Sequence, residues 1–213
     1  NAGAHIQHHY LFNSKFYDGP HINPEWYCAE GWDPLLMILE TYDQIIGDLL
    51  LTGEKIIGLT GLSQTPHEQQ TFYWRPIKHK EFLRELGVSG NFKVVPRMSR
   101  DFLIQSKSKN HLLEIEKLLG SYVDSIENKP VFVIDNRGDS LFIELVYDKD
   151  ISGNLEIINE SNRISNLKNK LVFVAIKNGH HDPKGFLFAN FDMDIPVSID
   201  LKETYKFIRN TAI

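Results

Sequence analysis

The chain has 213 residues, of which 42% are hydrophobic and 24% are charged, a composition typical of folded domains and not of disordered or fibrous proteins. The formal net charge is −5, and the sequence carries no stripe of Lys and Arg side chains that would contact phosphates along a nucleic acid. A nucleic acid polymer is therefore not an expected partner. The single cysteine, Cys28, excludes an internal disulfide and any cysteine-rich zinc site, so a metal would have to be held by His and carboxylate side chains.

No apolar run approaches the roughly 20 residues needed to span a bilayer. The first residues also lack the basic and apolar regions of a signal peptide. We therefore expect a soluble chain with no membrane partner, and the cytoplasm is slightly favoured as its compartment. Its length suits one core, or one core with a smaller inserted subdomain.

The first predicted helix lies in "GWDPLLMILETYDQIIGDLLLTGEK", where Asp33 can cap the helix, Pro34 suits its first turn and Gly53 can end it. The next segment, "KIIGLTG", is a short apolar run that predicts a buried strand, and "LSQTPHEQQ" after it predicts a polar loop. A helix, a buried strand and a polar loop in succession are typical of α/β proteins, in which ligands bind beyond the carboxyl ends of the strands.

The middle of the chain shows a different pattern. The segments "KEFLRELG" and "HLLEIEKLLGSYVDSIE" predict helices, and "VFVIDNRGDSLFIELVY" predicts two strands joined by a turn at Gly138. Residues 76–164 are therefore predicted to form an inserted, cap-like α+β subdomain.

The last part of the chain returns to the first pattern. The segment "LVFVAI" predicts a buried strand that runs into a loop, "KNGHHDPKG", and then into "FLFANF", while "YKFIRN" is a modest helix candidate. Residues 1–75 and 165–213 are therefore expected to form one α/β core, with a mostly parallel sheet, flanking helices and loops that carry a metal site.

Histidine is the residue type that most suggests chemistry. Seven of the nine histidines lie in or near predicted loops or element ends: His5, His8, His9, His21, His67, His180 and His181. Neutral imidazole binds zinc, manganese or iron, so pairs from separate loops that meet at a sheet edge would form a metal site. The alternative is that these are surface side chains or buried, hydrogen-bonded ones. If the first segment is helical, His5 and His9 share one face of it, although the Glu of the metalloprotease motif is missing.

The order of three segments resembles the carboxyl-terminal half of the alkaline phosphatase superfamily, particularly its type I phosphodiesterase and nucleotide pyrophosphatase branch. The three segments are "NAGAHIQHHY", "KIIGLTGLSQTPH" after a helix, and "NGHHDPKGFLFANF". The resemblance implies a mostly parallel sheet and two divalent metals, commonly zinc, beside a Thr or Ser nucleophile that attacks phosphorus or sulfur. It also implies an Asp-x-x-x-His element, in which Asn1 stands at the Asp place and His5 at the His place.

The resemblance also implies a Gly-x-His ligand segment, which Gly179 and His181 match. The expected metal ligands are therefore His5 and His181, followed by His180 and His9. Two positions depart from the family pattern, because Gly61 and Leu62 occupy the places of a metal-binding Asp-His pair; His67, further along, is a candidate replacement. The nucleophile of the family belongs to an amino-terminal half, so no catalytic residue is assigned in this chain.

The function expected from the resemblance is the carboxyl-terminal part of a metal-dependent hydrolase of small phosphate or sulfate esters, inactive without its amino-terminal half. The alternative is a non-catalytic binding protein that retains the fold. A third hypothesis treats the histidines as incidental and the chain as an interaction module. The sequence specifies neither the substrate and the residues that bind it nor the oligomeric state.

Overall fold

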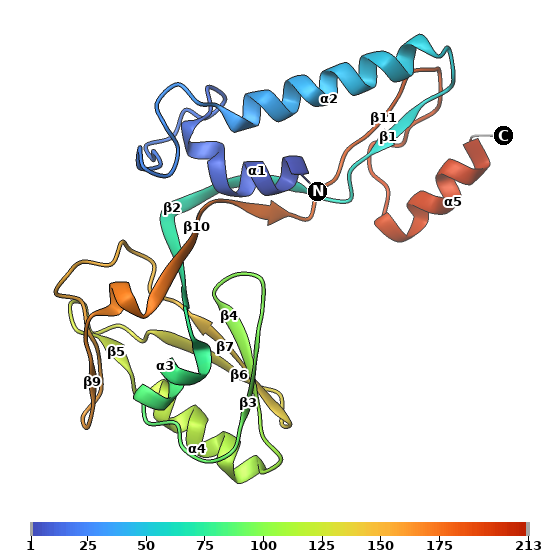
Figure 1. The fold of residues 1–213 in the computed structure, drawn as a ribbon. Helices are drawn as coiled ribbons and strands as arrows, with labels where there is room; N and C mark the ends of the chain where they lie inside the picture. Colours follow the sequence, from blue (N-terminus) through green and yellow to red (C-terminus); the bar gives the residue numbers. More distant parts are fainter. Residues whose placement is uncertain (1, 212–213) are drawn as a thin grey trace. The chain divides into compact units, whose positions relative to one another are not determined.

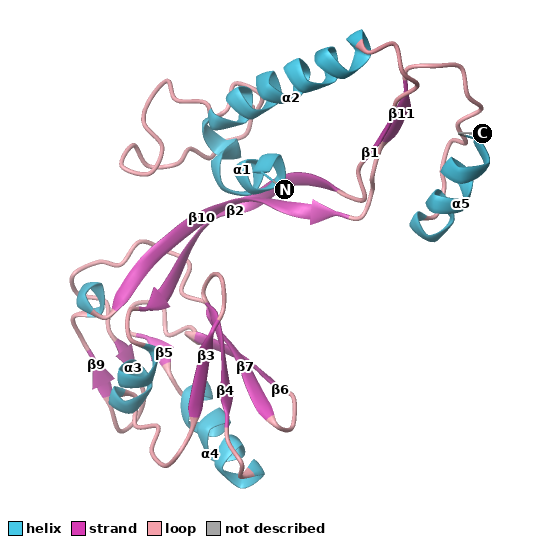
Figure 2. Ribbon diagram, turned by 45° about the vertical axis from the view of Figure 1, so that its right-hand side comes forward, coloured by secondary structure: helices cyan, strands magenta, loops and turns pink. Residues whose placement is uncertain are grey.

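The computed structural model describes residues 2–211, and the chain divides into two compact units (Figure 1). Unit 1 comprises the described part of Asn1–Glu68 and Asn178–Ile213, and unit 2 comprises Gln69–Lys177. The boundaries between the units lie after residues 68 and 177, whereas the sequence predicts them after residues 75 and 164. The chain passes between the units along two strands that pair with each other, β2 (Ser63–Pro76) and β10 (Leu171–Asp182) (Figure 2).

Unit 1 is built mainly from helices. Besides parts of β2 and β10, its elements are α1 (Ala2–Tyr10), the 3₁₀ turn η1 (Leu11–Asn13), α2 (Pro34–Leu51), β1 (Ile57–Leu59), β11 (Leu187–Ala189) and α5 (Leu201–Thr211). Strands β1 and β11 pair antiparallel, with Gly58 opposite Phe188. Helix α1 packs on α2, and the amide of Gly3 donates a hydrogen bond to the Tyr42 hydroxyl at 2.9 Å.

The predicted first helix is confirmed as α2, and so are its starting signals. Pro34 occupies its first turn, and the Asp33 carboxylate caps it by accepting a hydrogen bond from the Leu36 amide at 2.9 Å. The same carboxylate accepts hydrogen bonds from the Lys15 amide at 2.9 Å and the Ser14 hydroxyl at 3.1 Å. Burial by itself would raise the pKa of Asp33, but these hydrogen bonds outweigh it and hold the pKa below its usual value.

We expect Asp33→Ala to destabilise unit 1 by about 1–2 kcal/mol at pH 7, because the α2 cap and the bonds to Ser14 and Lys15 are lost. Since the folded-state pKa of Asp33 is depressed, its carboxylate stabilises the fold fully above the ionisation range of an ordinary Asp, near pH 4, and this contribution is lost as the pH falls through the lowered pKa. Urea unfolding at several pH values should show the wild type and variant converging in acid. Asp43→Ala, an exposed site within α2, is the control, and an equal loss there would contradict the capping role.

Much of the surface of α2 is apolar. Met37, Ile45 and Leu49 are each about half exposed, at 56%, 50% and 46%. Within residues 2–211, no helix combines the length and the apolar character needed to cross a membrane.

Unit 2 is an α+β structure with two sheets. Besides parts of β2 and β10, its elements are α3 (His79–Glu85), β3 (Lys93–Pro96), β4 (Asp101–Gln105), α4 (Lys109–Gly120), β5 (Val123–Asp124), β6 (Phe132–Asn136), β7 (Ser140–Leu145), β8 (Ile157–Ile158), β9 (Arg163–Ile164) and η2 (Leu167–Asn169). The strand orders are β3-β4-β7-β6 and β5-β8-β9, and all these neighbours pair antiparallel.

The core of unit 2 follows from the alternation of side chains along its strands. Leu141, Ile143 and Leu145 lie on one face of β7 and are fully buried, as is Phe102 on β4 beside it. The predicted hairpin is confirmed as β6 and β7, whose turn contains Gly138 with a positive φ of 86°.

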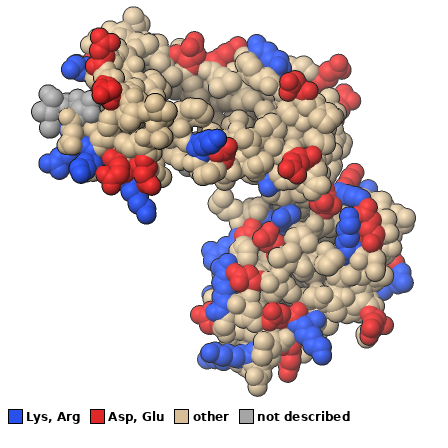
Figure 3. Space-filling model, turned by 180° about the vertical axis from the view of Figure 1, so that it is seen from behind, with Lys and Arg blue, Asp and Glu red and all other residues tan. Residues whose placement is uncertain are grey.

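Charged side chains of both signs intermingle on the face drawn in Figure 3. One pair of opposite charges in unit 2 is Arg100 and Glu144: the Arg100 guanidinium donates two hydrogen bonds to the Glu144 carboxylate, at 3.0 and 3.2 Å. The guanidinium also lies over the Tyr73 ring, 4.6 Å from its centroid. Because the Arg100–Glu144 ion pair is partly exposed to solvent, we expect it to orient these side chains more than to stabilise the fold.

The predicted mostly parallel sheet is wrong. Helices and strands both form, but the sheets are small and antiparallel. Parallel sheets are built from strands joined by long, usually helical, crossovers. Here only three residues separate β1 from β2 and four separate β10 from β11, and the strands so joined belong to different sheets, in which β1 pairs with β11 and β2 with β10.

Two segments predicted as loops are strands. All of the segment "LSQTPHEQQ" except Leu62 forms the first part of β2, and "KNGHHD" is the end of β10. These two strands pair with each other, which satisfies backbone groups that would otherwise need water. The predicted buried strand "KIIGLTG" is only the three-residue β1, whose Leu59 is 45% exposed. The helix predicted from "HLLEIEKLLGSYVDSIE" is α4, which ends at Gly120, earlier than expected.

Candidate metal centre

Helix α1 brings three imidazoles together. His5 and His9 are four residues apart and therefore share one face of the helix, with ring centroids 4.7 Å apart. His8 lies beside His9, with centroids 4.9 Å apart and ring planes at 80°.

Strand β10 adds a fourth imidazole. The ring centroid of His181 lies 5.6 Å from that of His8. We call His5, His8, His9 and His181 the histidine cluster; its members form a continuous series of ring contacts in the order His5, His9, His8, His181. The cluster lies within unit 1.

His180 belongs to a separate group. Successive side chains of a strand point to opposite faces, so His180 and His181 diverge on β10. His180 Nε2 is hydrogen-bonded to the Thr65 hydroxyl of β2 at 2.9 Å, and the His180 ring lies 6.0 Å from that of His67. Two groups of imidazoles therefore lie along the end of β10.

Close packing holds α1 against β2 and β10. The Gln64 side-chain amide donates a hydrogen bond to the Ala4 carbonyl at 2.7 Å. On β10, a Cβ at Gly179 would be tightly packed, 3.3 Å from the Gln7 carbonyl oxygen and 3.5 Å from the His8 Cα. A glycine before His180 and His181 thus lets the strand approach the helix that carries the other histidines.

A buried pair of asparagines fixes the same region. Asn178, which is fully buried, donates to the Asn23 side-chain oxygen at 2.9 Å and accepts from the Asn23 amide at 2.7 Å. The Asn178 oxygen also accepts from the backbone amide of Phe12 at 3.0 Å. The Asn23 amide lies 3.4 Å from the carbonyl oxygen of His9, so the asparagine pair ties β10 directly to α1.

The donors of the histidine cluster fit a divalent transition metal in kind, since imidazole is a common ligand of zinc, manganese and iron. A buried oxygen lies nearby as well: Gln64 Oε1, next to Gly179, accepts no hydrogen bond from any described residue. Within residues 2–211, however, no three or more His, Cys, Asp or Glu side chains are arranged to hold one ion. Metal uptake by the cluster would therefore require its rings to turn.

The structure places the predicted ligands in two groups. His5, His9 and His181 lie in the cluster, and His180 lies with Thr65 and His67. Asn1, which the resemblance places with His5, is outside the described residues. Gly61 and Leu62 lie in the connection between β1 and β2 and offer no metal-binding side chain.

The sequence counts His8 among the candidate imidazoles but does not select it as a ligand, and it gives no role to Thr65 or Asn178. His8 is the member that links α1 to β10, and its position next to His9 was the available signal. Thr65 and Asn178 act through partners far away in the chain, so no local pattern could have identified them.

No family model matches this chain, and neither the curated proteins nor the solved structures searched contain a match.

Proposed function

We propose that the chain supplies histidine ligands to a metal-dependent hydrolase of small phosphate or sulfate esters, as the carboxyl-terminal part of a protein of the phosphodiesterase and nucleotide pyrophosphatase kind. The observation that supports this proposal best is the series of ring contacts that joins His5, His9 and His8 of α1 to His181 of β10. Histidines from two of the three segments that carry the resemblance meet in this cluster.

In this proposal the histidine cluster and His180, on opposite faces of β10, serve the two metals that the resemblance implies, with zinc preferred and manganese or iron as alternatives. A bound divalent metal would act as a Lewis acid on the ester and stabilise the negative charge that develops during hydrolysis. The chain's own residues position the donors. When His180 Nε2 carries the proton, it donates to the Thr65 hydroxyl and Nδ1 is left as the metal-binding atom. No catalytic residue is assigned.

The first experiment is elemental analysis of tag-free protein equilibrated with zinc, manganese or iron. We expect bound metal in the wild type, its loss in His5→Ala and in His181→Ala, and about tenfold weaker binding in Thr65→Val, which removes the hydroxyl that orients His180. His21→Ala is the matched control, because His21 lies in unit 1 but outside both groups. A wild type that takes up no metal, or equal losses in all three alanine variants, would contradict the proposal.

The alternative function is a binding protein that has lost the chemistry. It is favoured by Gly61 and Leu62, which place no donor where the family pattern has a metal-binding pair. Turnover of aryl phosphate mono- and diesters by the natural full-length protein separates the two: metal-dependent turnover supports the hydrolase, and ester binding without turnover supports the alternative.

A further inference from the structure

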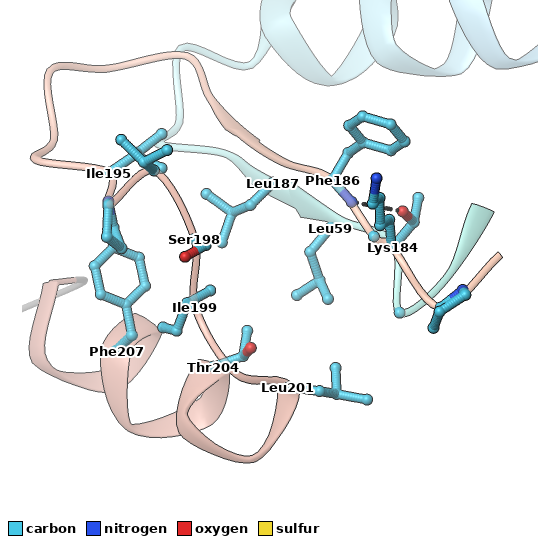
Figure 4. Close-up of a pocket in the computed structure, with 16 residues that line it drawn as sticks. Leu59, Lys184, Phe186, Leu187, Ile195, Ser198, Ile199, Leu201, Thr204 and Phe207 are labelled. Atoms are coloured by element: carbon cyan, nitrogen blue, oxygen red, sulfur yellow. Dashed lines mark hydrogen bonds between the residues drawn. The ribbon is translucent and has the colours of Figure 1, made fainter.

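A cavity of about 630 Å³ lies within unit 1, bounded by the β1–β11 pair, the loop before α5 and α5 itself (Figure 4). Figure 4 shows Leu59 and Leu187 extending from the strand pair toward the segment that carries Ile199 and Thr204. The lining of the cavity is mainly apolar and includes Leu59, Leu187, Ile195, Ile199, Leu201 and Phe207.

Two local features build the walls. Thr60 and Phe186 exchange hydrogen bonds: the Thr60 amide donates to the Phe186 carbonyl at 2.8 Å, and the Phe186 amide donates to the Thr60 hydroxyl at 2.9 Å. On α5, Leu201, Thr204 and Phe207 recur every three residues, which places them along one side of the helix, and all three line the cavity.

The charge at the cavity has one sign. Lys184 is the charged side chain among the described lining residues, none of which is acidic. Lys184 is exposed, and its ammonium forms no ion pair with any residue from 2 to 211. Figure 4 shows Lys184 beside Phe186 on one side of the cavity, with Phe207 on the other. An apolar space with a cation at one side is complementary to a molecule with an apolar body and an anionic end.

We propose that this cavity binds an amphipathic anion, with its hydrocarbon chain against Leu59, Leu187 and Phe207 and its carboxylate or phosphate head on the Lys184 ammonium. The volume lies in the range of small-molecule sites, roughly 300–1,000 Å³. Burial of the ligand's hydrocarbon chain supplies the affinity, and the Lys184 ammonium selects a negatively charged head group. The site uses no member of the histidine cluster, so the proposal is independent of metal binding.

The test is titration calorimetry of the full chain with decanoate, decyl phosphate and the uncharged decan-1-ol, all below micelle formation. We expect both anions to bind more tightly than the alcohol, and the tighter of the two identifies the head group. Octanoate should bind about tenfold more weakly than decanoate, since two fewer methylene groups are buried. No saturable binding of either anion, or affinity that does not depend on chain length, overturns the proposal.

Matched variants locate the binding. Leu59→Glu, which places a negative charge on the cavity wall, should weaken decanoate binding at least about tenfold, whereas Leu51→Glu, at a leucine that is 87% exposed on α2, should not. Lys184→Met should weaken binding of both anions and leave that of decan-1-ol unchanged, with Lys206→Met on α5 as its control. Since Lys184 is exposed, this variant tests the site even if Leu59→Glu fails to fold. Equal effects of a cavity variant and its control overturn the proposal.

Discussion

Replacement of Asn178 by alanine is expected to lower the free energy of unfolding of unit 1 by about 3 kcal/mol. The side chain of Asn178 is fully buried, and its hydrogen bonds include two with Asn23 and one with the Phe12 amide. Its removal deprives the buried Asn23 side-chain oxygen and the Phe12 amide of these hydrogen bonds and opens a cavity, and both effects destabilise. Because the asparagine pair ties β10 to α1 near His9, the variant is also expected to separate His8 from His181.

The measurement is urea unfolding followed by fluorescence of Trp26 and Trp32, in a Trp74→Phe background so that the signal reports unit 1. Asn210→Ala, at an exposed asparagine of α5, is the control and should change stability by less than about 0.5 kcal/mol. Equal stability of the two variants would show that the asparagine pair does not hold the region together.

Elements with local signals could be predicted from the sequence. Helix α2 was recognisable because Asp33, Pro34 and the spacing of its apolar residues all act within a few turns of each other. The β6–β7 hairpin was recognisable because its turn contains Gly138, where a positive φ is required, between two strongly apolar runs. In both cases the residues that determine the structure are neighbours in the chain.

Elements that depend on distant partners could not be predicted. The first part of β2 is polar on both faces, so it has neither the alternation nor the apolar run of a typical strand. The end of β10 is polar as well, so the sequence pattern does not predict that this strand continues past its apolar part. What makes both of them strands is their mutual pairing, which brings together residues as far apart as Thr65 and His180, separated by 115 positions.

The same limit applies to the candidate metal centre. The sequence indicated that histidines from both ends of the chain would meet, and ring contacts between α1 and β10 are present in the structure. The sequence did not indicate that His180 and His181 would belong to different groups, because its pattern predicts a loop at these two residues. On a strand, adjacent residues necessarily point to opposite faces.

A second large effect is expected at Gly185, where alanine should destabilise unit 1 by about 2–3 kcal/mol. A Cβ at this position would overlap the Thr60 carbonyl oxygen and lie 3.2 Å from the carbonyl carbon of Gly61. These are backbone atoms, which cannot move aside as the end of a flexible side chain can. The two hydrogen bonds between Thr60 and Phe186 must therefore lengthen or break, and the cavity wall that these bonds hold is disrupted.

The matched control for Gly185→Ala is Gly47→Ala, which should have the opposite sign. Gly47 lies inside α2 and a Cβ there would meet nothing within 4 Å, so alanine should stabilise the helix by about 0.5–1 kcal/mol. The pair separates the steric cost at Gly185 from the general preference of chains for alanine over glycine, because both variants add the same methyl group. Urea unfolding of the two variants decides the matter: if Gly185→Ala is as stable as the wild type, the 183–187 segment does not pack against Thr60 in solution. In that case decanoate binding should also be lost from the wild type, since the same contact forms the cavity wall.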